Sequence, residues 1–381
     1  MYRSLRMTSI KEDLMAASNN DSAHTSEERL IDRTDALLLD LDGTVYHGAR
    51  PIPEAVSALN EAHSHVGLKY ITNNASRSPS AVAEALQEMG IPASENDILT
   101  SAQAGVTLLV SKIPAGSRVI VLGSDSLKEL VSEAGFSVVT SADDQPAAVI
   151  QGHATTTGWP QMSEAALAIN NGAVYVATNM DTTLPTERGL TVGNGSMIAA
   201  ITTATGVIPD SAGKPAGDMF TQAAEELHSD RPLAVGDRLN TDIAGGVAAG
   251  IPSLMVITGI SGHKDLLTAD PAERPTYIAD NMMALFDSID RSAPGSKSGW
   301  KAEVTLDGVL QLSSVDGEFP EGSAEESLDG ADSPEQGRIS DRRRHDALLT
   351  AIAAAWEEGA PAVTQVAATD STAQSVIDTW R

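Results

Sequence analysis

The chain has 381 residues, no cysteine and a formal net charge of −27 at pH 7. Such a charge argues against nucleic acid or an anionic membrane as partner, because both require clustered lysine and arginine. The absence of cysteine excludes disulfides, thiolate catalysis and Cys-ligated zinc, and it fits a cytoplasmic protein. The N-terminal segment lacks the apolar stretch of a signal peptide, and no apolar run is long enough to span a membrane. The length predicts two or three domains.

The chain begins with a polar, aperiodic segment, residues 1–33, which we expect to be a disordered leader. From residue 34 to about residue 290, apolar strand-like runs alternate with helix-like runs, and Gly, Asn and Asp mark the turns. This alternation predicts an α/β fold with parallel sheets. The predicted strands are 36–39, 68–72, 117–123, 147–152, 173–179, 232–237 and 252–259, and the predicted helices are 53–65, 80–90, 126–135, 216–228 and 241–250.

The composition changes at residues 291–299, a segment rich in Ser, Pro and Gly that predicts a linker. Residues 300–381 are then expected to form a small accessory extension of α+β type. Its acidic tract near 315–340 is predicted to be disordered. The predicted elements of the extension are two short strands, 301–306 and 309–314, and an amphipathic helix, 343–359.

Two aspartates, Asp40 and Asp42, come directly after the first apolar strand. Open α/β sheets bind ligands at the carboxyl ends of their strands, and two carboxylates so close repel each other unless a cation compensates. An EF-hand calcium loop does not fit, because its fifth and twelfth positions would be Thr44 and Pro51. A capped turn is one reading of the pattern. The other is covalent catalysis, in which Asp40 attacks phosphorus, Asp42 transfers protons, and the backbone at Gly43 approaches the phosphoryl oxygens.

Two further groups follow apolar segments later in the chain. Thr72, Asn73 and Asn74 end the second predicted strand, where they form either an Asn-rich turn before a helix or a set of phosphate contacts. Lys214 stands between a glycine and a proline. It is either a solvated surface charge or a point charge that offsets the repulsion between a nucleophile and a phosphate.

The last group is Asp237, at the end of another apolar strand, and Asp242, five residues later. Asp242 alone could be a helix N-cap. Magnesium needs few protein carboxylates, so Asp40 and Asp237 with one backbone carbonyl would be enough to hold Mg²⁺. A divalent cation would also offset the crowded carboxylates after the first strand.

These four motifs, in this order, resemble those of the haloacid dehalogenase (HAD) superfamily of phosphatases. The motifs are DLDGT, the Thr72 segment, Lys214 and GDRLNTD, and the resemblance covers roughly residues 35 to 290. The interval between Asn74 and Lys214 is similar to the C2-type cap of the NagD-like and phosphoglycolate phosphatases, and it contains ATNMDTTLPTERG and GNGSMIAAI. With its extension, the chain resembles actinobacterial glycerol 3-phosphate phosphatases that carry a partial acetyltransferase-like segment.

The resemblance implies a Rossmann-like core with a parallel sheet, formed by residues 34–101 and 210–290. It also implies an inserted α/β cap, residues 102–209, that selects the substrate. A homodimer paired through the cap would be in keeping with capped relatives.

The resemblance also implies roles for individual residues. Asp40 is the expected nucleophile and Asp42 the expected acid and base, while Asp242 is expected to orient Lys214 or a metal-bound water. Arg188 in the cap and Arg238 beside Asp237 are candidates for reading the leaving group, with a surface ion pair as the alternative for each. The expected phosphate contacts are Gly43, Thr72, Asn73, Asn74 and Lys214, and the expected Mg²⁺ ligands are Asp40, Asp42 through its carbonyl, and Asp237.

The implied activity is a Mg²⁺-dependent phosphomonoester hydrolase of glycerol or phospholipid metabolism that acts through an aspartyl-phosphate, with glycerol 3-phosphate as the favoured substrate. The alternatives are another small phosphorylated metabolite (phosphoglycolate, pyridoxal phosphate, a nucleoside monophosphate or a sugar phosphate) or a phosphate-binding regulator with little turnover. The presence of Asp42 favours turnover. Residues 297–381 contain no Gly-rich turn for acetyl-CoA, so removing them is expected to lower stability and to leave kcat nearly unchanged.

Overall fold

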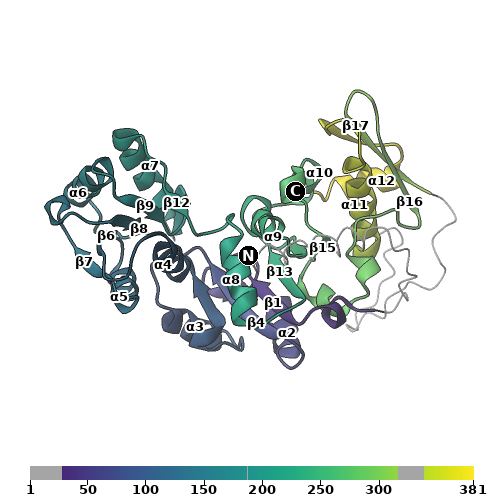
Figure 1. Cartoon of the computed structure of the whole chain (residues 1–381). Coiled ribbons are helices and arrows are strands. Elements are labelled where there is room, and N and C mark those ends of the chain that lie inside the picture. Colours follow the sequence, from purple (N-terminus) through teal and green to yellow (C-terminus); the bar gives the residue numbers. More distant parts are fainter. Residues whose placement is uncertain (1–27, 187, 316–338) are drawn as a thin grey trace, which may run out of the picture.

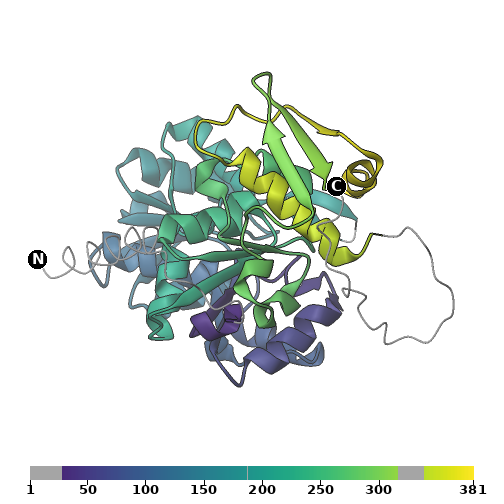
Figure 2. The same cartoon turned by 90° about the vertical axis from the view of Figure 1, so that its right-hand side faces the viewer.

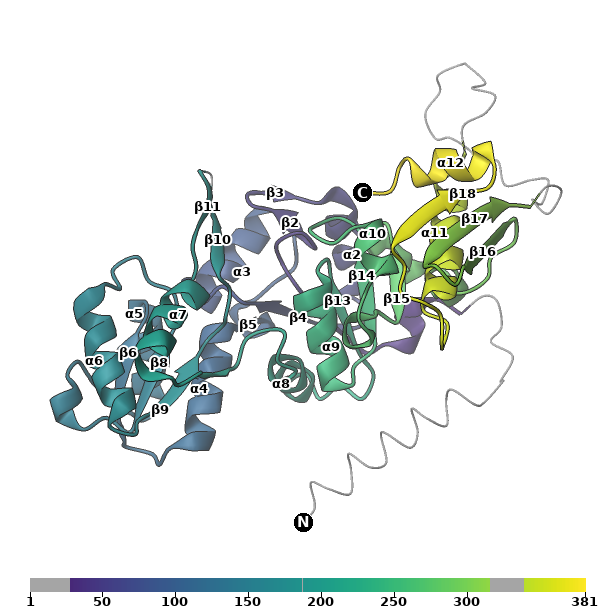
Figure 3. The ribbon, with the colours of Figure 1, turned by 90° about the horizontal axis from the view of Figure 1, so that it is seen from above.

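The computed structural model describes residues 28–186, 188–315 and 339–381. Most of the predicted leader and most of the predicted acidic tract lie outside these residues. The described residues form a central core with the cap on one side and the C-terminal extension on the opposite side (Figures 1 and 3). Across these ranges, no helix has the length and apolar character needed to cross a membrane.

The core is a six-stranded parallel sheet with helices on both faces. Its strands, in spatial order, are β15 (Tyr277–Ala279), β14 (Ser253–Val256), β13 (Pro232–Gly236), β1 (Ala36–Leu39), β4 (Gly67–Thr72) and β5 (Ile98–Thr100). Its helices are α2 (Pro53–Ala62), α3 (Pro79–Glu88), α8 (Asp218–Glu226), α9 (Ala244–Ala249) and α10 (His263–Leu267). Leu37 and Leu39 of β1 pack with α2 and α3, whereas Leu38 packs with α8. The continuous apolar run therefore forms a strand buried on both faces, as predicted.

The parallel register brings several strand ends to one edge of the core sheet. Leu39 lies opposite Val235 on one side and Tyr70 on the other. The residues after β1, β4 and β13 therefore meet at this edge, next to a short hairpin that follows β1. The hairpin strands are β2 (Tyr46–His47) and β3 (Arg50–Pro51).

The cap is a second α/β body inserted between β5 and α8, with a parallel sheet of its own (Figure 1). Its strands, in spatial order, are β12 (Asp210–Ser211), β9 (Val174–Ala177), β8 (Ala148–Gln151), β6 (Arg118–Leu122) and β7 (Ser137–Val139), and an antiparallel hairpin consists of β10 (Thr183–Thr186) and β11 (Gly189–Val192). Its helices are α4 (Ser101–Lys112), α5 (Asp125–Glu133), α6 (Trp159–Asn170) and α7 (Asn194–Thr205). Since β12 pairs with β9, residues 210–211 belong to the cap sheet and not to the expected core segment 210–290.

The C-terminal extension is a small mixed sheet with two helices. Its strands are β16 (Trp300–Val304), β17 (Val309–Ser314) and β18 (Gln365–Ala368), and its helices are α11 (Asp341–Ala355) and α12 (Ser371–Ile377). Strand β17 pairs antiparallel with β16 and parallel with β18. Helix α11 lies between the core and this sheet (Figures 1 and 2). Buried residues of the core, such as Met255 and Leu266, and of the extension, such as Leu349 and Trp380, form one apolar cluster.

Two boundary segments are more ordered than the sequence suggested. Leu30–Arg33, at the end of the predicted leader, forms a 3₁₀ turn in which Leu30 and Ile31 are buried in the core. This corrects the expectation that the leader extends to residue 33, because the apolar side chains of the turn fill the core beneath α2. The segment 291–299, predicted as a linker, is hydrogen-bonded to both sides: Ser292 O accepts from the Ile278 amide, and the Gly295 amide donates to Leu349 O.

Candidate active site

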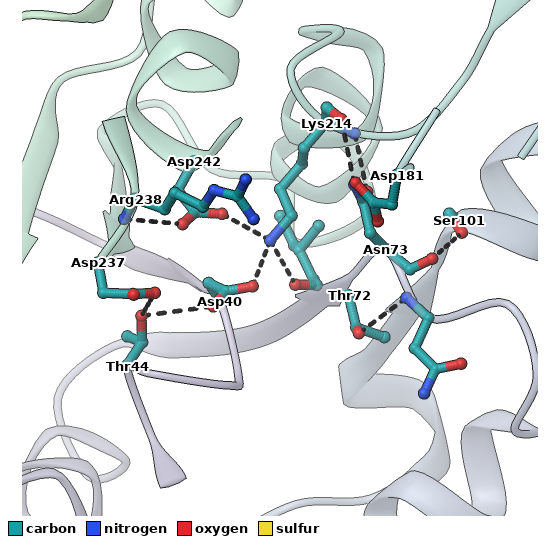
Figure 4. Close-up of polar contacts among 12 residues, drawn as sticks. Asp40, Thr44, Thr72, Asn73, Ser101, Asp181, Lys214, Asp237, Arg238 and Asp242 are labelled. Carbon is teal, nitrogen blue, oxygen red and sulfur yellow. Dashed lines mark hydrogen bonds and ion pairs between the residues drawn. The ribbon is translucent and has the colours of Figure 1, made fainter. Parts of the chain in front are cut away.

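Three carboxylates converge at the strand-end edge of the core sheet (Figure 4). Asp40 follows β1, Asp237 follows β13, and Asp242 lies on the π-helical turn Leu239–Ile243 just beyond. A carboxylate oxygen of each lies within 4.8 Å of the others. Asp237 and Asp242 are 1% and 3% exposed, and the side chain of Asp40 is 15% exposed. The sequence predicted that Asp40 and Asp237 meet, and the structure places Asp242 in the same cluster.

Lys214 reaches into this cluster from the segment between the cap and α8. Its side chain is 3% exposed, so it is not the solvated surface charge of the alternative interpretation. The ammonium donates to Asp40 Oδ1, to Asp242 Oδ1 at 2.7 Å and to Ile71 O at 3.2 Å. Burial lowers the pKa of Lys214, but the charges of Asp242 and Asp40 raise it by more than burial lowers it. The pKa of Lys214 therefore lies above its usual value. Lys214 is therefore a fixed cation beside the Asp40 carboxylate.

The carboxylates outnumber the cation that faces them. Burial and, after it, Asp242 raise the pKa of Asp237 to about 6, and burial and Asp40 raise the pKa of Asp242 to about 6. Burial also raises the pKa of Asp40, against the effect of Lys214. A cluster of hard oxygen donors with excess negative charge is the donor set that Mg²⁺ prefers. The arrangement therefore fits a divalent cation.

Asp237 is tightly enclosed by backbone and by a hydroxyl. Thr44 Oγ1 donates to Asp237 Oδ1 at 3.2 Å and is 3.4 Å from Asp40 Oδ2, and the Ile260 amide donates to Asp237 Oδ2 at 2.6 Å. A Cβ added at Gly43 or Gly259 would overlap the Asp237 carboxylate, and Gly43 also has φ +97°. Glycine is required at both positions for this close approach.

Asp42 lies outside the Lys214 network. It is exposed, and its carboxylate accepts a hydrogen bond from the Gly48 amide at 3.1 Å, in the turn between β2 and β3. Tyr46, on β2, is near both aspartates: burial and the charges of Asp40 and Asp42 raise the pKa of its hydroxyl to about 12. Tyr46 follows the DLDGT motif by two residues, but no role was predicted for it, because a single tyrosine beside a motif gives no sequence signal of its own.

The segment after β4 is occupied mainly by contacts within the protein. Thr72 Oγ1 accepts from the Asn74 amide at 3.1 Å, and Asn74 Oδ1 accepts from the Ser76 amide and hydroxyl. Asn73 Oδ1 accepts from the Lys214 amide at 2.9 Å, and its Nδ2 donates to Lys214 O at 3.1 Å. In this structure the Asn73 side chain therefore fixes the backbone that carries Lys214.

A buried polar network joins this segment to the cap. Asn73 O accepts from Ser101 Oγ and from Asn179 Nδ2, both at 2.7 Å, and Asn194 Nδ2 donates to Asn179 O at 2.8 Å. Asp181 lies at the same junction, where its Oδ1 accepts from Asn73 Nδ2 at 3.3 Å and burial raises its pKa. Asp181 belongs to the family-like stretch ATNMD, but no role was predicted for it, because an acidic residue in a loop gives no sequence signal of its own.

The two candidate arginines lie in different places. Arg238 is exposed; its amide donates to Asp242 Oδ2 at 3.2 Å and its Nε donates to Asn240 Oδ1 at 2.9 Å. Arg188 lies in the β10–β11 hairpin and lines a cavity of about 860 Å³. The other lining residues are His153, Ala154, Thr155, Thr157, Met162, Leu184, Thr191, Val192 and Met197. All of them belong to the cap, so this cavity contains no residue of the Asp40 cluster.

Two family models and the most similar relatives match this chain to the same family. A model of haloacid dehalogenase-like hydrolases matches residues 37–137, and a HAD-hydrolase-like model matches residues 211–285. A D-glycerol 3-phosphate phosphatase from Mycobacterium tuberculosis is 46% identical over 270 residues, which are 71% of this chain and 76% of that enzyme. A 5'-nucleotidase from Bacillus subtilis is 35% identical over 248 residues, which are 64% of this chain and 94% of that protein.

Solved structures agree with the sequence matches. The glycerol phosphate phosphatase from M. tuberculosis in complex with magnesium superposes with a TM-score of 0.82 at 38% identity, covering 93% of this chain and 98% of that one. A p-nitrophenyl phosphatase from Archaeoglobus fulgidus has a TM-score of 0.61 at 27% identity and covers 66% of this chain. The chain belongs to the haloacid dehalogenase-like hydrolases. Within that family it is a phosphoric monoester hydrolase.

Proposed function

We propose that the protein is a Mg²⁺-dependent glycerol 3-phosphate phosphatase that acts through an aspartyl-phosphate on Asp40. The observation that carries the proposal is the cluster of Asp40, Asp237 and Asp242 around the buried Lys214 ammonium. The similarity to a D-glycerol 3-phosphate phosphatase, at 46% identity, supports the choice of substrate.

Asp40, Asp237 and the carbonyl of Asp42 are the proposed Mg²⁺ ligands. When bound, the ion would neutralise charge on the carboxylates and on the phosphoryl oxygens. Both oxygens of Asp242 are engaged, one by the Lys214 ammonium and one by the Arg238 amide. We therefore assign Asp242 the role of orienting Lys214.

The proposed reaction has two displacements at phosphorus. In the first, an Asp40 oxygen forms a bond to phosphorus, the bond to the glycerol oxygen breaks, and that oxygen takes a proton from Asp42. In the second, Asp42 takes a proton from a water that attacks the same phosphorus, which releases phosphate and restores Asp40. The Gly48 amide bonds to Asp42 Oδ1, so Asp42 Oδ2 is the oxygen we assign to these proton transfers.

Substrate binding is assigned to the residues around the nucleophile. Lys214 would contact the phosphate as it contacts Asp40 now, with the Gly43 backbone and the Thr72–Asn74 segment close by. Several further points remain predictions from the sequence. They are the assignment of Arg188 and Arg238 to the leaving group, the cytoplasmic location, the cap-mediated homodimer, the acetyltransferase-like character of the extension and the domain boundaries other than those corrected above.

The test is a phosphate-release screen with the full chain in Mg²⁺ and in a chelator. The substrates are glycerol 3-phosphate, phosphoglycolate, pyridoxal phosphate, nucleoside monophosphates and sugar phosphates. We expect the highest kcat/KM for glycerol 3-phosphate and loss of turnover in the chelator. A higher kcat/KM for another ester would reassign the substrate, and phosphate binding without turnover would favour a regulator.

A further inference from the structure

The loop 257–262, which follows β14, contacts two separate parts of the Asp40 site. Thr258 Oγ1 donates to Gly43 O at 2.6 Å. The Ile260 amide donates to Asp237 Oδ2 at 2.6 Å, and the Ser261 amide donates to Asp237 O at 3.1 Å. The loop therefore sets the orientation of the Asp237 carboxylate and its place relative to the turn after β1.

The other side of this loop is held by the end of the C-terminal extension. Arg381 Nη2 donates to Ile257 O at 2.5 Å, and Arg381 O accepts from the Lys264 amide at 3.2 Å. The Trp380 ring stacks on His263, with ring centroids 6.3 Å apart and planes 8° apart. A Cβ added at Gly262 would overlap the Arg381 backbone, so the two segments are in direct contact. Figures 1 and 3 both place the C-terminus beside α10.

The loop is packed near its two ends, where Ile257 and Ser261 are buried and Ser261 Oγ accepts from the Leu239 amide at 3.1 Å. Ile260, at its centre, is 71% exposed, and α10, which follows it, has five residues. Trp380 is 4% exposed and belongs to the apolar cluster shared by the core and the extension. The extension thus contacts the loop at both ends, at Ile257 and at Gly262, and residues 260–261 between these ends hold Asp237.

We propose that Trp380 and Arg381 are positioning residues for the metal site, acting through the loop 257–262 on Asp237. The inference rests on the proposed role of Asp237 as an Mg²⁺ ligand. Groups that orient a metal-binding side chain affect metal affinity even when they do not touch the ion. The extension would then contribute to Mg²⁺ affinity as well as to stability, which revises the expectation that removing it leaves turnover nearly unchanged.

The test compares Mg²⁺ binding by the full chain and by three variants, using titration calorimetry at a temperature where all are folded. Trp380→Ala removes the stacked ring, and Arg381→Ala removes the hydrogen bond to Ile257 O while leaving most packing in place. Leu312→Ala is the matched control, because Leu312 is fully buried in the same cluster on β17. We expect both C-terminal variants to weaken Mg²⁺ binding by on the order of tenfold, the lower range for groups that orient metal ligands.

The control should lower the thermal unfolding temperature but keep the Mg²⁺ affinity of the unmodified chain. Equal Mg²⁺ affinity in Arg381→Ala and the unmodified chain, or an equal loss in Leu312→Ala, would overturn the proposal. If the unmodified chain itself fails to bind Mg²⁺, the proposed metal site is wrong instead. The two failures are therefore distinguishable.

Discussion

Lys214 is a buried cation beside three carboxylates, and this imbalance is the main electrostatic feature of the site. With Asp40, Asp237 and Asp242 ionised, the cluster carries more negative charge than Lys214 offsets. Burying unpaired charge is costly, and it shows in the raised pKa values of Asp237 and Asp242. A bound cation would remove that cost.

The first prediction concerns pH and Mg²⁺. The pKa of Asp237 and of Asp242 is about 6 in the folded chain, above the ordinary value of about 3.9 for an unfolded aspartate. Between about pH 4 and 6 the folded state therefore binds more protons than the unfolded state. As the pH rises through that window, these two groups lower the free energy of unfolding. Mg²⁺ needs the ionised carboxylates, and protons compete with it below about pH 6.

We expect the increase in unfolding temperature caused by Mg²⁺ to be small at about pH 5 and larger at about pH 7.5, because of this competition. Thermal unfolding with Mg²⁺ or with a chelator across this range measures it. An increase independent of pH would mean that Asp237 and Asp242 do not titrate with the metal.

Single residues of the site were predictable where a polar side chain follows an apolar strand. Asp40 and Asp237 each stand at such a strand end, and the parallel register brings them together. Tyr46 and Asp181 were not predictable from the same pattern. Tyr46 depends on a two-residue hairpin strand, and Asp181 depends on how the cap sits on the core.

At the scale of elements, the core strands β5 and β15 and the helices α4, α6, α7 and α10 were not predicted. The core strands β1, β4, β13 and β14 and the helices α2, α3, α5, α8, α9 and α11 followed from their apolar patterns. Strand β18 and helix α12 did not, because β18 is an edge strand with no fully buried residue, formed by pairing with β17. Leu30–Arg33 was assigned to the leader, since four residues are too few to show a period. Helix α11 was predicted, and it packs on one side against the extension sheet and on the other against the core.

The second prediction tests how α11 joins the extension to the core. Leu349 is fully buried in the cluster that both bodies share. Leu349→Ala should destabilise the whole chain by about 2–5 kcal/mol, the usual range for a buried leucine. Leu306→Ala is the matched control, because Leu306 is 98% exposed in the same extension, and it should change stability by less than about 0.5 kcal/mol.

Chemical denaturation, followed by tryptophan fluorescence and by far-UV circular dichroism, measures both variants. Coincident transitions in the two signals would show that the core and the extension unfold together. Separate transitions, with only the fluorescence transition shifted in Leu349→Ala, would contradict the shared cluster.

At the scale of the whole molecule, the core holds the Asp40 cluster, the cap joins the core nearby through Asn73 and Asp181, and the extension reaches the cluster through the loop 257–262. In the proposed function the substrate binds at the Asp40 cluster, which the cap adjoins and which the extension reaches through this loop. The net charge of −27 lies mostly outside this site and is screened by salt beyond about 8 Å. Lys214 and a bound cation can thus hold an anionic substrate despite that charge.

The central claim is that Asp40 is the nucleophile of a Mg²⁺-dependent phosphatase, and Asp40→Asn tests it most directly. An amide has nearly the same size as the carboxylate but is a poor nucleophile and a poor metal ligand. The measurement is phosphate release from glycerol 3-phosphate in Mg²⁺ by purified, cooperatively folding Asp40→Asn, with Asp143→Asn, an exposed cap substitution, as the matched control. We expect kcat to fall by roughly 10³-fold or more in Asp40→Asn and to stay unchanged in Asp143→Asn. Retention of about a tenth of the unmodified rate by Asp40→Asn would contradict the covalent mechanism.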